Sequence, residues 1–130
     1  MKCFDLVDPW TGKVNYVDAN NVVLGFDTER CCCESFGHAV VSSLAEAKEV
    51  SEGRADPSPL DITAYSFAQE PPHSVDCSED CAEYNHALAF RILAPNMRDL
   101  FVAIWNHHNG YYSHGFTLRG PGVAELDGIL

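Results

Sequence analysis

The sequence predicts an α+β fold, mainly a twisted antiparallel β-sheet of about five to seven strands with one short helix. Three observations favour this class. Short apolar runs alternate with turn residues over the first 26 positions, a single segment has helical spacing, and an Asn-Gly pair separates two strand-like runs near the C-terminus. One face of such a sheet must be covered, by the helix or by a second subunit, so a homodimer is compatible with the sequence.

The first third predicts a meander with short connections. Strands are expected at 3–7, 14–17 and 22–26, and the turn between the first two contains Pro9 and Gly12. Proline presets the backbone angle φ, and glycine tolerates a positive one. The polar, cysteine-rich stretch 27–38 has no clear periodicity and predicts an ordered loop.

The helix is expected over 42–50. Ser42 or Ser43 can cap it, Glu46 completes a capping box with Ser43, and Gly53 can end it. Residues 60–68 alternate between apolar and polar and predict a strand, as do residues 84–93. The acidic, proline-containing stretch 69–83 predicts an exposed excursion, within a single domain over 1–130. The tail 121–130 predicts a loosely ordered end or an interface arm.

The clearest local signal lies near the C-terminus. Residues 100–105 are apolar on both faces, as in a central strand. Asn109-Gly110 then predicts a hairpin with a type I′ turn, because both central positions need a positive φ. In that register Trp105 pairs with His114, and His107 shares a face with His114 as its diagonal neighbour.

Composition narrows the function classes. The 130 residues carry a net charge of −11, which repels phosphate backbones and argues against direct nucleic-acid binding. No apolar run is long enough to span a membrane and no signal peptide pattern is visible, so we expect a soluble cytoplasmic protein. The six cysteines include three in a row, a poor arrangement for disulfides, and predict free thiols in a reducing compartment.

Two motifs together resemble a known family. They are Cys32-Cys33-Glu34-Ser35 and Asn109-Gly110-Tyr111-Tyr112-Ser113. Their order is similar to that in a family of small prokaryotic and phage-encoded domains of unknown function, over roughly residues 22–118. The resemblance implies a shared fold and a mobile-element origin. The stretch 70–83 departs from the family as an insertion, and His114 stands where relatives carry an acidic residue.

These motifs and the hairpin supply the candidate ligand-binding residues: Cys32, Cys33, Glu34, Ser35, Trp105, His107, Asn109, Tyr111, Tyr112 and His114. The aromatic side chains can line a pocket for a cationic or aromatic ligand, or simply pack in the core. The cysteines can act as nucleophiles with a histidine base, or as small apolar fillers. Cysteine and histidine can also bind a metal, but the spacing is not that of a zinc finger, and we expect no metal and no cofactor.

Two function hypotheses follow. The first is a non-catalytic binding module for a small molecule or a protein partner, acting as an accessory or counter-defence factor of a mobile element. No phosphate-binding glycine loop or hydrolase motif is present, which favours this hypothesis. The second is a small thiol- or metal-dependent enzyme that uses the residues Cys32, Cys33, Glu34, His107 and His114.

Overall fold

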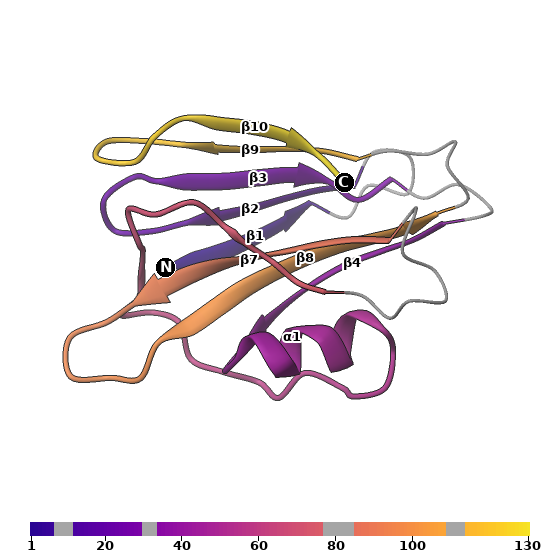
Figure 1. Cartoon of the computed structure of the whole chain (residues 1–130). Helices are drawn as coiled ribbons and strands as arrows, with labels where there is room; N and C mark the ends of the chain where they lie inside the picture. The colour runs from indigo at the N-terminus through magenta and orange to yellow at the C-terminus, as the bar shows by residue number, and fades with distance from the viewer. Residues whose placement is uncertain (7–11, 30–33, 77–84, 109–113) are drawn as a thin grey trace.

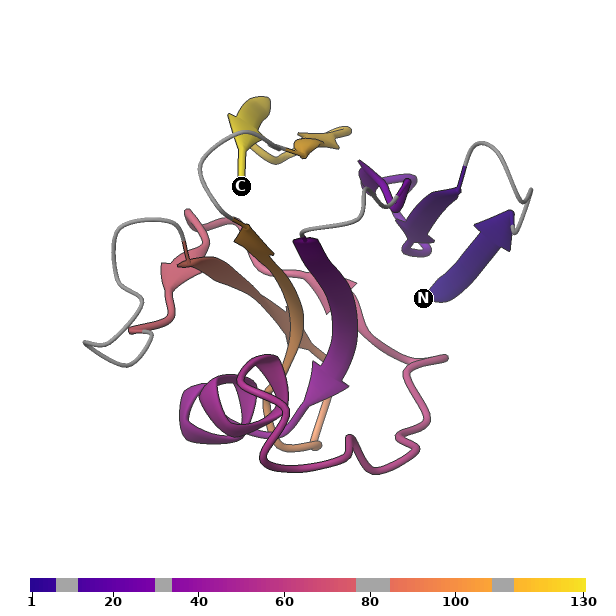
Figure 2. The same ribbon diagram turned by 90° about the vertical axis from the view of Figure 1, so that its right-hand side faces the viewer.

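Two antiparallel β-sheets pack face to face, and one helix covers the outer side of the second sheet (Figure 1). This computed structural model describes residues 1–6, 12–29, 34–76, 85–108 and 114–130. The view turned by 90° keeps the helix and the first sheet on opposite sides of the second sheet (Figure 2). The predicted α+β class is confirmed, but the described strands form two sheets instead of one.

The first sheet has the strand order β1-β2-β3-β9-β10 and begins with the predicted meander. Its strands are β1 (Lys2–Leu6), β2 (Lys13–Val17), β3 (Val23–Asp27), β9 (Gly115–Arg119) and β10 (Leu126–Ile129). The meander strands were therefore predicted to within about one residue at each end. The C-terminal part of the chain completes the sheet, because β9 pairs with β3 and β10 pairs with β9.

The second sheet has the order β4-β8-β7-β5, and β6 also pairs with β7. Its strands are β4 (Glu34–Val41), β5 (Ser66–Phe67), β6 (His73–Ser74), β7 (Asn85–Leu93) and β8 (Leu100–His108). Strand β8 lies between β4 and β7, so the prediction of a central strand at 100–105 is confirmed.

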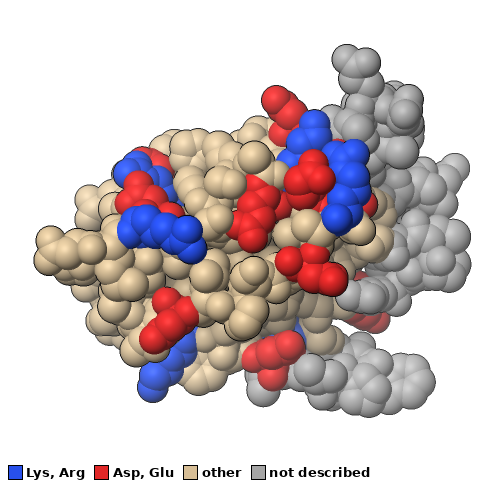
Figure 3. Space-filling view, turned by 90° about the horizontal axis from the view of Figure 1, so that it is seen from below, with Lys and Arg blue, Asp and Glu red and all other residues tan. Residues whose placement is uncertain are grey.

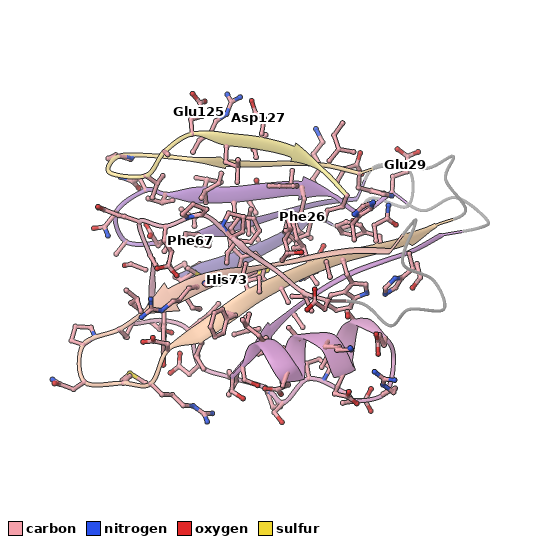
Figure 4. The ribbon with its side chains drawn as sticks, in the orientation of Figure 1. Phe26, Glu29, Phe67, His73, Glu125 and Asp127 are labelled. Atoms are coloured by element: carbon pink, nitrogen blue, oxygen red, sulfur yellow. The ribbon has the colours of Figure 1, made fainter. Side chains whose placement is uncertain are left out.

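The main core fills the space between the two sheets. Ring centroids of Phe26 and Phe36 lie 5.6 Å apart, and those of Phe90 and Phe116 lie 5.7 Å apart, so both pairs bridge the sheets. Figure 4 shows Phe26 in this interlayer space. Aromatic pairs at this separation add to the free energy of burying the rings.

Helix α1 (Leu44–Ser51) packs on the outer side of the second sheet, where small side chains leave room for it. Ala39, Ala89 and Ala103 occupy adjacent strands and are almost fully buried beneath the helix residues Ala47 and Val50. An alanine side chain projects only a short distance above the sheet, so the helix axis can lie close to the strands. None of the described helices is long and apolar enough to cross a membrane.

The helix begins where the capping signal predicts. Ser43 is the N-cap, and its Oγ accepts a hydrogen bond from the Glu46 backbone N–H at 3.1 Å. The Glu46 carboxylate accepts from the backbone N–H of Ser42 at 2.7 Å, one residue earlier than in a standard capping box. The hydrogen bonds that the Ser42 hydroxyl and then the Ser42 backbone N–H donate to it hold the pKa of the Glu46 carboxyl below its usual value. Gly53 follows the C-cap with φ of +71°, a conformation that favours glycine.

Three predicted segments between β3 and β7 differ from the structure. The expected loop at 27–38 contains the start of β4, whose faces are both covered, so it lacks the alternation of a one-sided strand. The expected strand at 60–68 is reduced to β5, because Asp61 accepts from the Thr63 N–H at 2.9 Å and the Tyr65 N–H bonds to the Ile62 carbonyl. The excursion at 69–83 contributes β6, and its residues 77–83 lie outside the described part.

The C-terminal tail is an ordered strand, contrary to the prediction for 121–130. Strand β10 pairs with β9, and Leu130 is 3% exposed in the core. The backbone of Leu130 exchanges two hydrogen bonds with His114, and its carbonyl also accepts from Nδ2 of buried Asn106 at 3.2 Å. Buried backbone groups need such partners, which explains why the tail joins the sheet.

The predicted pairing of the last hairpin is wrong. Both edges of β8 are occupied by β4 and β7, and Trp105 lies opposite Gly37 and Ala87 instead of His114. The chain leaves the second sheet after β8 and enters the first sheet at β9. The Asn109-Gly110 turn itself lies outside the described residues. An Asn-Gly pair favours a reversal of direction, but it does not decide which strands become neighbours.

Candidate functional site

A hollow of about 560 Å³ lies between the C-terminal end of α1, the segment that follows it and the ends of β4 and β8. We call it the α1–β4 hollow. Its volume is in the range of small-molecule pockets, roughly 300–1,000 Å³. It is lined by Ser35, Phe36, Gly37, His38, Val50, Ser51, Glu52, Gly53, Ala55, Asp56, Pro57, Trp105 and His107.

Trp105 lies directly over the backbone of Gly37. The two residues are cross-strand partners in β4 and β8, and a Cβ atom added to Gly37 would lie 2.4 Å from Cζ2 of the indole. No side chain fits in that space. Glycine is therefore required at position 37 so that a large aromatic ring can lie on the strand and form one wall of the hollow.

His107 joins the sheet to the end of the helix. Its Nε2 lies 2.7 Å from the backbone carbonyl oxygen of Ser51, the last residue of α1. A carbonyl can only accept, so Nε2 carries the proton and Nδ1 of the neutral ring is left as an acceptor. That Nδ1 is buried and has no hydrogen-bond partner in the part of the chain that the structure describes. Leaving a buried acceptor unpaired costs about 1–3 kcal/mol.

The electrostatic surroundings of the hollow are negative. Glu52 and Asp56 line it, and the residues of the C-terminal turn of α1 do as well. A helix C-terminus carries a partial negative charge from its aligned peptide dipoles. The nearby Arg54 forms ion pairs with Glu52 and, at 3.3 Å, with Glu49. Figure 3 shows such acidic and basic side chains interspersed over the α1 side of the molecule.

The structure brings three of the candidate residues together. Ser35, Trp105 and His107 all line the hollow, and Ser35 is the cross-strand partner of His107. Glu34 is in turn the partner of His108, so the strand ends that lead to the two family-like motifs lie side by side. The other candidates Cys32, Cys33, Asn109, Tyr111 and Tyr112 lie outside the described residues, as does the Glu34 side chain.

His114 does not belong to this group, and its predicted proximity to His107 is wrong. It lies between the sheets, 7% exposed, with its ring stacked on Phe36 at 4.5 Å. Its Nδ1 is 3.1 Å from the carbonyl oxygen of Asp27 in the first sheet. His107 instead faces α1 on the opposite side of the second sheet. The crossing of the chain between sheets separates the two imidazoles.

A polar cluster that the sequence did not indicate links β1, β2 and β4. The Tyr16 hydroxyl lies 2.9 Å from Nδ1 of His38, and Cys3 also interacts with Tyr16. Burial raises the pKa of the Cys3 thiol and of the Tyr16 hydroxyl, and it lowers the pKa of the His38 imidazole. All three groups are thus held neutral near pH 7, and a protonated thiol is a poor nucleophile. The sequence periodicity cannot predict such a cluster, because its three residues belong to three separate strands.

A second hollow, of about 130 Å³, lies between the β5–β6 connection and the β9–β10 hairpin. Its walls include Pro71, Pro72, Val123 and Leu126. It is smaller than typical ligand pockets, and its lining is largely apolar. In residues 1–6, 12–29, 34–76, 85–108 and 114–130, no group of three or more His, Cys, Asp or Glu side chains is placed to hold a metal ion.

Comparisons with known proteins add no family to this geometry. No protein-family model, no curated protein and no solved structure matches the chain. The function is therefore argued from the hollow and its residues.

Proposed function

We propose that this protein is a non-catalytic binding module that holds a small molecule in the α1–β4 hollow. One observation carries the proposal: His107 presents a buried acceptor nitrogen that has no partner among the described residues, next to the indole of Trp105. Ligand pockets typically combine an aromatic wall with a few fixed polar groups that orient the ligand. The Ser51 carbonyl fixes the orientation of the imidazole, and Gly37 fixes the position of the indole.

Binding is favoured over catalysis by how the side chains of the hollow are arranged. A general base is normally found within hydrogen-bond reach of a nucleophile and is oriented by a third group. His107 is oriented by a backbone carbonyl, and no described side chain places a nucleophile on its other nitrogen. Cys3, the cysteine in the described part of the chain, interacts with the buried Tyr16 of the first sheet.

In the alternative, a thiol- or metal-dependent enzyme, His107 can still belong to the site, but His114 cannot because it lies on the other side of the second sheet. This alternative is favoured by the pairing of His107 with Ser35, because Ser35 is only two positions from Cys33 in the sequence. Free-thiol titration against pH together with elemental analysis tests it. A cysteine that ionises below pH 7, or a stoichiometric metal, would support the enzyme, whereas six ordinary thiols without metal would exclude it.

A fragment screen by two-dimensional NMR of the ¹⁵N-labelled protein tests the binding proposal. We expect hits to shift the Trp105 indole N–H signal and the amide signals of Gly37 and Gly53, all of which belong to the hollow. The variant Trp105→Phe assigns the indole signal and should weaken the hits. Thr117→Val on β9, on the first sheet, is the matched control and should leave them unchanged. Hits that map elsewhere, or a full screen without hits, would refute the proposal.

The proposal includes the wider context expected from the sequence. We place the module in the cytoplasm, with a mobile-element origin and without direct contact to nucleic acid, because its net charge of −11 repels phosphates. The module can also bind a protein partner or a second copy of the chain. Light scattering of the purified protein tests for the second copy, and the genes that neighbour its own gene test the mobile-element origin.

A further inference from the structure

We infer that the ligand of the α1–β4 hollow is a small organic cation bearing an N–H group, such as an alkylammonium or alkylguanidinium ion. This inference rests on the proposed function and names the ligand class of the same site. Two features of the hollow favour a positive charge, and a third favours an N–H donor.

The first feature is the combination of an indole and a helix end. Trp105 lines the hollow from β8, and Val50, Ser51 and Glu52 line it from the C-terminus of α1. The face of an indole attracts cations through the negative charge above its ring. The aligned peptide dipoles of the helix act in the same direction within its last turn.

The second feature is the balance of charged side chains. The described residues that line the hollow include the carboxylates of Glu52 and Asp56 but neither lysine nor arginine. Arg54 is not a lining residue, and its guanidinium pairs with Glu49 and with the lining residue Glu52. An anionic ligand would meet these carboxylates and the helix end without a basic side chain among the described lining residues, whereas a cation is attracted by both.

The third feature is the hydrogen-bonding state of His107. Because its Nε2–H donates to the Ser51 carbonyl, the Nδ1 atom of the neutral ring can only accept. A ligand that satisfies it must therefore donate a hydrogen bond. An ammonium or guanidinium N–H is such a donor, and its charge strengthens the bond. An ionised carboxylate has only acceptor oxygens and cannot satisfy this nitrogen.

Four probes built on an unbranched four-carbon chain test the inference: butylammonium, butylguanidinium, neutral butyramide and anionic butyrate. Tetramethylammonium, a cation without an N–H group, is the fifth. Titration of each probe, followed at the Trp105 indole N–H by NMR, should give saturable shifts with the two butyl cations. Binding of butyramide and butyrate should be at least tenfold weaker. Tetramethylammonium should bind more weakly than butylammonium, because it cannot donate to His107.

Two variants test the contributions of Asp56 and His107 to cation binding, and a third is a control. Asp56→Asn should weaken the butyl cations about two- to fivefold, as expected for one exposed charge. Asp127→Asn removes the same charge on β10, where Figure 4 shows the side chain projecting from the far side of the molecule, and should have no effect. His107→Gln keeps an N–H that can donate to Ser51, but its acceptor is Oε1, which does not occupy the position of Nδ1. It should weaken the butyl cations about tenfold and tetramethylammonium little.

The outcomes separate this inference from the proposed function. Equal binding of neutral, anionic and cationic probes at Trp105 would overturn the cation inference and leave the binding module standing. Cation binding that is insensitive to both Asp56→Asn and His107→Gln would overturn it as well. If none of the five probes, nor any fragment of the wider screen, shifts the Trp105 signal, both conclusions fail.

Discussion

Replacing Asp18 by alanine removes a carboxylate that holds the two sheets together. Asp18 is 4% exposed at the start of the β2–β3 turn. Its Oδ1 accepts from the backbone N–H groups of Asn20 at 2.8 Å and Val22 at 3.0 Å. Its Oδ2 accepts from the N–H of Phe67, in β5 of the second sheet, at 2.9 Å. One side chain therefore closes a local turn and fixes a segment 49 positions away.

The expected loss follows from these three bonds. Hydrogen bonds to a charged group contribute about 1.5–3 kcal/mol each. The amide of Asn20 lies on an exposed turn and can bond to water instead, so only the buried N–H groups of Val22 and Phe67 lose their partner outright. Asp18→Ala should lower the free energy of unfolding by about 3–6 kcal/mol. Against a typical total of about 5–15 kcal/mol, this is a large fraction.

Urea unfolding followed by circular dichroism and tryptophan fluorescence measures the loss. The midpoint should fall while the slope stays unchanged, because the area exposed on unfolding is the same. Asp61→Asn is the matched control, since Asp61 accepts from the Thr63 N–H at 2.9 Å but is exposed, and its midpoint should stay close to that of the unmodified protein. An Asp18→Ala protein within 1 kcal/mol of the unmodified protein would refute the reasoning.

Three further predictions follow. Gly37→Ala should displace the indole of Trp105, destabilise the fold by about 1–3 kcal/mol and shift the tryptophan fluorescence to longer wavelength. An unchanged emission spectrum would contradict this prediction. Burial lowers the pKa of the His38 imidazole in the folded protein, so on acidification the unfolded chain binds a proton at this histidine before the folded protein does. The free energy of unfolding should therefore fall as the pH drops below about 6.5. His38→Gln should make this free energy less dependent on pH between about 7.5 and 5.5, and a pH profile identical to that of the unmodified protein would contradict the prediction. Ser43→Ala removes the helix N-cap and should cost about 0.5–2 kcal/mol in thermal unfolding, with a loss below that range counting against the cap.

Several elements could be predicted because their signals are local. The N-cap Ser43, its partner Glu46 and the terminating Gly53 lie within eleven positions, and helix α1 begins and ends as they indicate. The meander of β1 to β3 follows its turn residues in the same way. For the candidate site, the sequence named Ser35, Trp105 and His107, but it predicted a loop at 27–38, and only the pairing of β4 with β8 places Ser35 opposite His107.

The amino-acid sequence by itself determined the strand-rich class, the single helix and the apolar central strand β8, since periodicity, capping and turn chemistry act over a few residues. Only the tertiary structure decided that β9 leaves its hairpin neighbour for the other sheet, which moves His114 away from His107. It also decided that the Ser51 carbonyl meets His107 from 56 positions away. Strand partners depend on which sheet edges are free in space, and no local pattern encodes that.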